Sequence, residues 1–214
     1  MFEHNELIMK PNLLFFCRHC LTILISGLLI SACKEEDKMQ YFTIDQDASA
    51  MEWKGFLKDD SGNNGTVKLI GKLSANDKGE ITGGEIKLPL ATLVNINLPT
   101  DALKEQLIHH LQSTDFFNMS MYPEIGFKIN SMSPNENQPG AYLATGELTM
   151  LGKTNPVSFP VTVNNVGNKL EIIGKTTIDR TLWGMDYATD ENAPDGMYIK
   201  PGIDVQLKLI AVRN

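Results

Sequence analysis

The stretch AYLATGELTMLGKTNPVSFPVTV, residues 141–163, decides the fold that we expect for this chain. Apolar or small residues alternate with polar ones on both sides of the turn-forming sequence GKTN: Tyr142, Ala144, Gly146, Leu148 and Met150, then Val157, Phe159, Val161 and Val163. Successive side chains of a strand point to opposite faces, so this alternation predicts two strands that each bury one face. The short turn between them predicts an antiparallel pair.

Six further runs share the same alternation, at residues 51–57, 67–73, 86–90, 125–129, 170–178 and 205–211. Short turn sequences such as NDKGE and PNENQPG separate most of them, so strands adjacent in sequence are expected to be adjacent in the sheet. Eight antiparallel strands with one apolar face each must turn those faces toward one another. The pattern therefore predicts an all-β domain, either a closed barrel or a two-sheet sandwich.

One convincing helix interrupts the strands. It is expected to begin near Thr100 or Asp101, because a threonine or aspartate there can cap the first turn. Leu103, Leu107 and Leu111 follow at fourfold spacing and would share one face.

Glycines occupy four of the inward strand positions, namely Gly55, Gly71, Gly146 and Gly174. Strand glycines permit the sharp bends that a barrel needs, which we take as their main role. A missing side chain also leaves space, so room for a small ligand is a by-product of the same pattern.

The N-terminal segment is typical of a secretory signal peptide. Lys10 and Arg18 precede the uncharged run CLTILISGLLISA at 20–32, which is too short for an ordinary membrane-spanning helix. The following LISAC sequence places small residues before Cys33 and resembles the lipobox of bacterial lipoproteins. We therefore expect Cys33 to become a lipid-modified N-terminus, with an unlipidated cleaved signal or an uncleaved anchor as the alternatives.

The charged run KEEDKMQ at 34–40 follows this cysteine. It fits a solvated tether between a bilayer and a folded domain. It equally resembles the signal that sends some Gram-negative lipoproteins to the outer cell surface. The expected organisation is a signal peptide at 1–32, a lipid-anchored tether at 33–40 and a β-barrel domain at 41–214.

Cysteines and charge exclude several classes of protein. Cys17, Cys20 and Cys33 are the three cysteines, and none lies in the predicted domain, so an internal disulfide is excluded there. The signal segment carries two basic and two acidic residues, so the net charge of −7 belongs to the mature chain. An acidic domain is repelled by nucleic acid and by anionic lipid, and neither is expected as a partner through electrostatics.

Four blocks of sequence together resemble the YceI-like family. The first reads HLxSxDFFxxxxYPxxxF from His110 to Phe127; the others are WKG at 53–55, GELTMLGKTNPVSFPV at 146–161 and IDRTLWGM at 178–185. The resemblance implies an eight-stranded antiparallel lipocalin-like barrel with one short helix between strands. It also implies an apolar tunnel that binds an isoprenoid or a similar long amphiphile, without catalysis.

The residues that we expect to line such a tunnel are mostly large and apolar. They are Trp53, Leu69, Leu88, Phe116, Phe117, Phe127, Leu148, Phe159, Ile172 and Trp183, with ordinary core packing as the alternative for each. Of the adjacent phenylalanines, one is expected to enter the barrel while the other wedges the helix against the sheet. Arg180 could hold a polar head group by paired hydrogen bonds, although an ion pair with Asp179 or Asp186 is the first expectation.

No group of residues predicts catalysis or a metal site. His109 and His110 are adjacent on the expected helix and point in different directions, with no acidic or cysteine partner at chelating spacing. No nucleophile, base and acid occur in a recognisable order. We therefore expect no enzyme and no cofactor, apart from a bound isoprenoid lipid or quinone.

Two functions are compatible with these observations. The first is a lipid-anchored protein of a Gram-negative cell envelope, expected at the outer membrane, that stores or transports a quinone or prenyl diphosphate. The second is an envelope interaction or stress-response protein whose barrel is filled by its own side chains.

Overall fold

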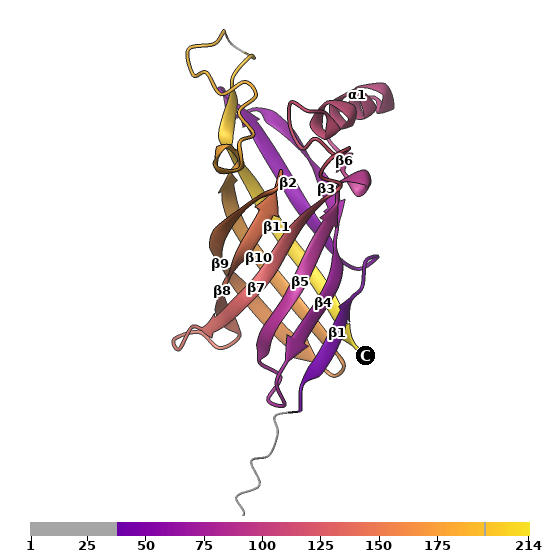
Figure 1. The fold of residues 1–214 in the computed structure, drawn as a ribbon, viewed down its shortest axis with the longest axis vertical. Coiled ribbons are helices and arrows are strands. Elements are labelled where there is room, and N and C mark those ends of the chain that lie inside the picture. Colours follow the sequence, from indigo (N-terminus) through magenta and orange to yellow (C-terminus); the bar gives the residue numbers. More distant parts are fainter. Residues whose placement is uncertain (1–37, 195) are drawn as a thin grey trace, which may run out of the picture. The chain divides into compact units, whose positions relative to one another are not determined.

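Eight antiparallel strands close on themselves in the computed structural model, which describes residues 38–194 and 196–214 (Figure 1). The closed ring runs in the order β1 (Gln40–Ile44), β4 (Ile70–Ala75), β5 (Ile81–Pro89), β7 (Glu124–Pro134), β8 (Ala141–Met150), β9 (Lys153–Val166), β10 (Lys169–Asp179) and β11 (Ile199–Arg213). Pairing of β1 with β11 closes it. Of the two predicted alternatives, a closed barrel or a two-sheet sandwich, the closed barrel is confirmed. Residues 141–163 form the β8–β9 hairpin, as expected.

Three further strands extend the sheet at one end of the barrel. They are β2 (Ala50–Leu57), β3 (Gly62–Lys68) and β6 (Val94–Asn95). β2 pairs with β11 along Ile199–Lys208, whereas β1 pairs with the last residues of the same strand. β1 and β2 therefore act as two halves of one interrupted strand.

β1 was not predicted from the sequence, where the first expected strand began at residue 51. Phe42 and Ile44 point inward and are buried, but they are the only two inward apolar residues of this short strand. Tyr41, an exposed aromatic residue, also disrupts the alternation. Its position is fixed by pairing with β4 and β11, which is information that local pattern does not contain.

The ring splits open between β3 and β5. β4 pairs with β5 up to Ile70 opposite Lys87, but β3 pairs with β6 instead. The gap is covered by the short 3-10 helix η1 (Leu90–Thr92), by β6 and by α1 (Asp101–Gln112). The backbone N–H of Lys68, at the end of β3, donates to Thr92 Oγ1 and ties η1 to the split.

α1 begins as predicted, because Thr100 Oγ1 accepts a hydrogen bond from the backbone N–H of Leu103. The expected apolar face is only partly used. Leu103 is 44% exposed, and no residue of α1 is fully buried, while Leu107 and Leu111 are half-buried. α1 is therefore a cover at the barrel end rather than part of a tightly packed core.

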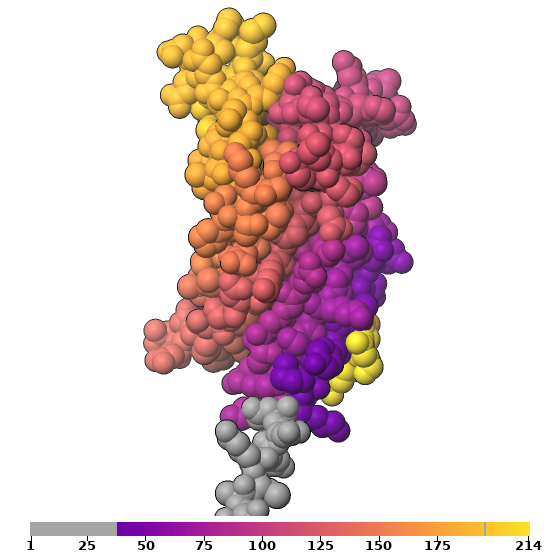
Figure 2. All heavy atoms as spheres, in the orientation of Figure 1, coloured from indigo at the N-terminus to yellow at the C-terminus, as the bar shows by residue number. Residues whose placement is uncertain are grey.

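The two ends of the barrel differ in what they carry (Figures 1 and 2). One end holds the start of β1, the C-terminus and three short turns between strands. The other end holds α1 and the long connection between β10 and β11, which begins with the 3-10 helix η2 (Arg180–Trp183). We call these the turn end and the helix end.

No helix of the described part of the chain is long and apolar enough to cross a bilayer. The predicted signal peptide at 1–32, Cys33 and most of the tether lie outside the described residues. The barrel domain predicted at 41–214 begins one residue after the first residue of β1.

Candidate functional site: an apolar cavity at the helix end

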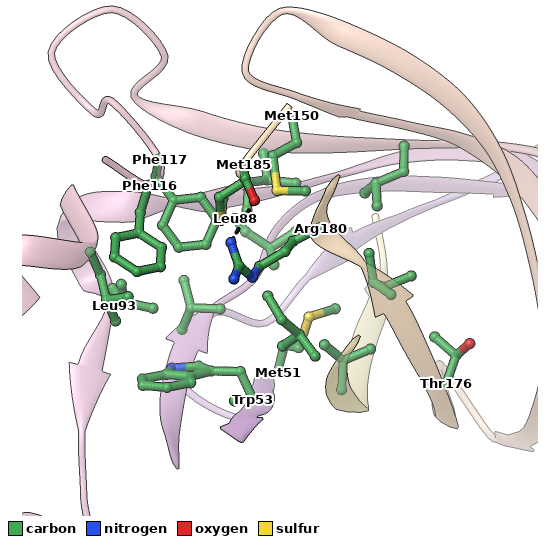
Figure 3. Close-up of a pocket in the computed structure, with 18 of the residues that line it drawn as sticks. Met51, Trp53, Leu88, Leu93, Phe116, Phe117, Met150, Thr176, Arg180 and Met185 are labelled. Carbon is green, nitrogen blue, oxygen red and sulfur yellow. Dashed lines mark hydrogen bonds between the residues drawn. The ribbon is translucent and has the colours of Figure 1, made fainter. Parts of the chain in front are cut away.

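A cavity of about 230 Å³ occupies the helix-end half of the barrel (Figure 3). Strands β2, β3, β5, β7, β8, β9, β10 and β11 supply its wall, and η1, α1, the turn after α1 and η2 cover it. The wall is almost wholly apolar. Lining residues include Met51, Trp53, Leu88, Leu93, Leu107, Leu111, Phe116, Phe117, Ile125, Phe127, Leu148, Met150, Phe159, Met185, Val205 and Leu207.

The cavity stops at a definite level inside the barrel. On β11 the inward side chain of Leu207 lines the cavity, but the next inward residue, Leu209, does not and is fully buried. On β10 the same change falls between Gly174 and Ile172. Below this level the barrel is filled by Phe42, Ile44, Leu69, Leu73, Ala75, Ile81, Ile129, Ala144, Val161, Leu170, Ile172, Leu209 and Ala211.

Inward glycines at this level make room for neighbouring side chains rather than for a ligand. A Cβ on Gly146 would lie 2.5 Å from the ring of Phe127, and one on Gly174 would lie 2.8 Å from Val161 and 3.2 Å from the ring of Phe159. The rings of Phe127 and Phe159 are in contact, with centroids 5.6 Å apart. The two glycines thus let a pair of aromatic rings cross the barrel.

The other two glycines of the sequence pattern have different roles. A Cβ on Gly55 would meet no atom within 4 Å, so at this lining residue the missing side chain does leave open space. Gly71 has φ +137°, and a Cβ there would strike the Glu85 carbonyl, so it permits a close approach of β4 to β5. The predicted ligand space is therefore present at one of the four positions.

Phe116 and Phe117 follow α1 in an irregular turn, and both line the cavity (Figure 3). Phe116 is 6% exposed and belongs to a small cluster with Met150, Trp183 and Met185. Phe117 is half-buried and packs against both this cluster and the main core. Both rings therefore face the cavity, whereas only one was expected to enter the barrel. They differ in that Phe117 is less buried and also packs against the main core.

Arg180 is buried, at 1% exposure, in the wall of the cavity. Its guanidinium donates to the backbone carbonyls of Met185, Tyr187 at 2.8 Å, Ile199 at 3.0 Å and Lys200 at 3.4 Å. The expected ion pair with Asp179 or Asp186 is therefore wrong. The side chain instead fastens the β10–β11 connection to β11, because its fork of donors matches carbonyls on both segments.

The charge state of Arg180 is shaped mainly by its surroundings. Burial lowers the pKa of the guanidinium, while the carboxylates of Asp186 and Asp179 act in the opposite direction. Asp179 itself accepts hydrogen bonds from the backbone N–H and hydroxyl of Thr181. The two acids thus act on Arg180 through their field rather than by direct contact.

His110 joins α1 to the β10–β11 connection. Its ring meets the rings of Phe116 and Tyr187 edge-on, with both centroid distances 5.0 Å, and its Nε2 lies 3.0 Å from Asp115 Oδ2. It also borders the cavity. In residues 38–194 and 196–214 no group of three histidine, cysteine or acidic side chains is placed to hold a metal ion.

Trp53 carries a buried polar atom without a partner. Its Nε1 has no hydrogen-bond acceptor among the described residues, although the indole belongs to the cavity wall. A buried donor left without an acceptor costs free energy, of the order of 1–3 kcal/mol. Because this atom is inaccessible even from the empty cavity, the N–H is not presented to a ligand.

The structure brings eight of the eleven predicted tunnel residues to the cavity: Trp53, Leu88, Phe116, Phe117, Phe127, Leu148, Phe159 and Arg180. Leu69 and Ile172 lie instead in the filled half. Trp183 lies behind Phe116, and its indole N–H donates to the Leu148 carbonyl at 3.0 Å.

Some lining residues were missed by the sequence analysis. Met51, Ile125, Met150 and Val205 sit on predicted inward faces, so the alternation could have included them. Met185 had no comparable signal, because it lies in the irregular connection after η2.

The family model of the YceI-like domain matches residues 42–211. The chain belongs to the YceI-like family. A curated relative is a UPF0312 protein of Pseudomonas putida, 32% identical over 82 residues. That match covers 37% of this chain and 42% of the relative, so the chain spans less than half the length of the curated proteins it matches.

Solved structures share the YceI-like barrel. BcnA of Burkholderia cenocepacia is similar with a TM-score of 0.64 and 18% identity, over 79% of this chain and 99% of that one. A polyisoprenoid binding domain from Saccharophagus degradans gives 0.61 and 10%, over 83% and 100%. A Campylobacter jejuni YceI protein gives 0.52 and 15%, over 75% and 84%. At these identities the likeness concerns the fold.

Proposed function

We propose that this protein binds the apolar tail of an isoprenoid lipid, of the quinone type, in the helix-end cavity, and stores or carries it in the cell envelope. The observation that carries the proposal is the cavity itself, which is apolar on nearly every side and remains unfilled by the chain. Apolar surface removed from water contributes roughly 25 cal/mol per Å², so such a wall favours a hydrocarbon occupant. The likeness to a polyisoprenoid binding domain supports the same ligand class.

The charges around the cavity favour a neutral head group over a diphosphate. The donors of Arg180 are directed at backbone carbonyls, and Lys200 is paired with Asp60. A diphosphate needs several cationic or N–H donors that are free to converge on it. A quinone head group carries no charge, so it requires no such set of donors.

We propose further that the barrel is anchored to a membrane, most simply the outer membrane of a Gram-negative bacterium, through a lipid on Cys33. The support is the uncharged run ending in LISAC and the charged sequence that follows it. Cys33→Ser should abolish incorporation of a fatty-acid analogue in metabolic labelling. Labelling that persists in this variant would reject Cys33 as the anchor.

Ligand binding is tested on the chain produced without its first 33 residues. Native mass spectrometry followed by organic extraction should detect a bound neutral lipid. Addition of a short prenyl quinone to delipidated protein should quench tryptophan fluorescence, because Trp53 lines the cavity and Trp183 packs behind Phe116. A prenyl diphosphate with the same tail should bind more weakly.

A pair of glycine variants separates cavity binding from surface binding. Gly55→Leu places a side chain in open cavity space, whereas Gly126→Leu adds the same side chain to an outward position of β7 that also has no atom within 4 Å. Gly55→Leu should reduce quinone binding at least tenfold while Gly126→Leu leaves it unchanged. Equal binding by both variants would place the ligand outside the cavity.

The second candidate is an envelope interaction or stress-response protein with no ligand. The observation in its favour is that half of the barrel is already filled by side chains. Protein that is purified empty, and that binds no prenyl compound of any length, would favour this function.

A further inference from the structure

The barrel is hollow in only one half, and this limits the length of tail that it can enclose. We propose that the site takes a short prenyl chain, of about two isoprene units, and excludes the rest of a longer polyprenyl tail from the protein. The inference rests on the proposed isoprenoid-binding function. It adds a length limit that follows from the side chains of this particular barrel.

The volume of the cavity sets the first part of the limit. Pockets for drug-sized ligands span roughly 300–1,000 Å³, and the cavity measures about 230 Å³. With roughly 30 Å³ for each water-sized group of atoms, about eight such groups fit. That number falls between one and two five-carbon units and is far below the requirement of an eight-unit tail.

The floor of the cavity sets the second part. Phe127 and Phe159 cross the barrel in contact, and each ring packs against a glycine on a neighbouring strand, Gly146 and Gly174 respectively. A side chain at either glycine would overlap a neighbour, so the rings have no free space into which they could withdraw on that side. The floor is therefore a packed layer.

The layers beneath this floor contain no room for a chain. Phe42, Leu69, Leu170 and Leu209 are each 0% exposed, and Leu73 is 1% exposed. The space beside another glycine, Gly84, is filled in the same way, since a Cβ there would lie 2.7 Å from Leu73 Cδ2. Threading a tail through this half would require several core side chains to move together, and close-packed interiors oppose such movement.

The experiment measures transfer of prenyl benzoquinones with one, two, three, four and eight units from phosphatidylcholine vesicles to the protein. A tail enclosed by the cavity exchanges one apolar surrounding for another, so partition stays nearly constant up to the limit. Each unit that stays outside the cavity leaves the bilayer for water, so partition should then fall at least tenfold per unit. We expect the fall to begin after two units.

Two phenylalanine variants test the floor directly. Phe127→Ala removes a floor ring and should move the fall to about three units. Phe42→Ala removes a ring of the same size from the filled half, where it does not line the cavity, and should leave the limit at two units. Phe127→Leu repeats the comparison if the alanine variant does not fold, with a smaller shift in the same direction.

The outcomes distinguish this inference from the function on which it rests. Transfer of no quinone of any length would reject the isoprenoid-binding function. Transfer that stays constant up to eight units would leave that function intact and overturn the length limit. A limit at two units that moves equally in the Phe127 and Phe42 variants would also overturn it, because the floor would then not set the length.

Discussion

The two halves of this barrel are built from the same strands and differ in how their inward positions are filled. At the turn end, eight paired strands surround side chains that are almost wholly inaccessible to solvent. At the helix end, β3 does not pair with β5. The gap between them is covered by η1, β6 and α1, which do not fill the interior. Closure of the sheet thus gives stability to one half, and its interruption gives the other half a cavity.

The largest expected effect compares two leucines two residues apart on β11. Leu209→Ala in the filled half should lower the free energy of unfolding by about 4–5 kcal/mol, because its neighbours enclose it on all sides. Leu207→Ala borders the cavity and should cost only about 2 kcal/mol, since fewer contacts are lost. Urea unfolding of both variants, without ligand, measures the difference. Equal losses would contradict the distinction between the halves.

The next effect concerns the arginine that ties the helix-end connection in place. Arg180→Met should cost roughly 2–4 kcal/mol, because the buried carbonyl of Met185 and the partly buried carbonyls of Tyr187 and Ile199 lose a charged donor. Arg213→Met is the control at the turn end, where an exposed guanidinium lies 5.5 Å from the ring of Phe42. It should cost less than about 1 kcal/mol. Thermal unfolding gives both values. An Arg180→Met variant as stable as the wild type would show that the β10–β11 connection stays in place without the guanidinium.

A smaller effect separates the adjacent phenylalanines. Phe116→Ala should cost about 3 kcal/mol, because the ring is buried among Met150, Trp183 and Met185. Phe117→Ala should cost about 1–2 kcal/mol, since its ring is only half-buried, but should weaken quinone binding more. Denaturant unfolding of delipidated protein and quinone titration are measured for each variant. If both lose equal stability and bind normally when folded, the pair is plain core.

The smallest effect is a pH dependence confined to the helix end. Burial, together with Glu191, raises the pKa of Tyr198 above its ordinary value in the folded protein. The unfolded chain therefore loses the Tyr198 proton first as the pH rises. The contribution of protonated Tyr198 to the free energy of unfolding is thus complete below about pH 10 and is lost as the pH rises above it. Tyr198→Phe should lose less stability than the wild type between pH 9 and pH 11. If the free energy of unfolding falls equally with pH in the two proteins, Tyr198 does not contribute to the pH dependence.

The alternation of apolar and polar residues was sufficient to predict much of the fold. Seven of the eight predicted runs became long strands facing one interior, and the N-cap of α1 was placed correctly at Thr100. The remaining run, 67–73, was divided between β3 and β4 at Leu69, because β3 and β4 pair with different strands. Which face a residue occupies depends on its own position, whereas the partner of a strand depends on distant residues.

The site was less accessible to sequence reasoning than the fold. Leu69, Ile172 and Phe159 share the same alternation, yet only Phe159 lines the cavity. A strand pattern gives the direction of a side chain but not its height within the barrel. Arg180 was placed in an ion pair because its acidic neighbours are close in sequence, whereas its true acceptors are carbonyls up to twenty residues away.

The sequence by itself determined seven of the long strands, their inward faces, the helix start and the family to which the barrel belongs. Only the tertiary structure decided where the barrel is hollow. The reason is that a cavity is a property of several strands at one level: Gly146 and Gly174 leave space, and Phe127 and Phe159 take it from neighbouring strands. Gly55 faces no such side chain, and its space stays open.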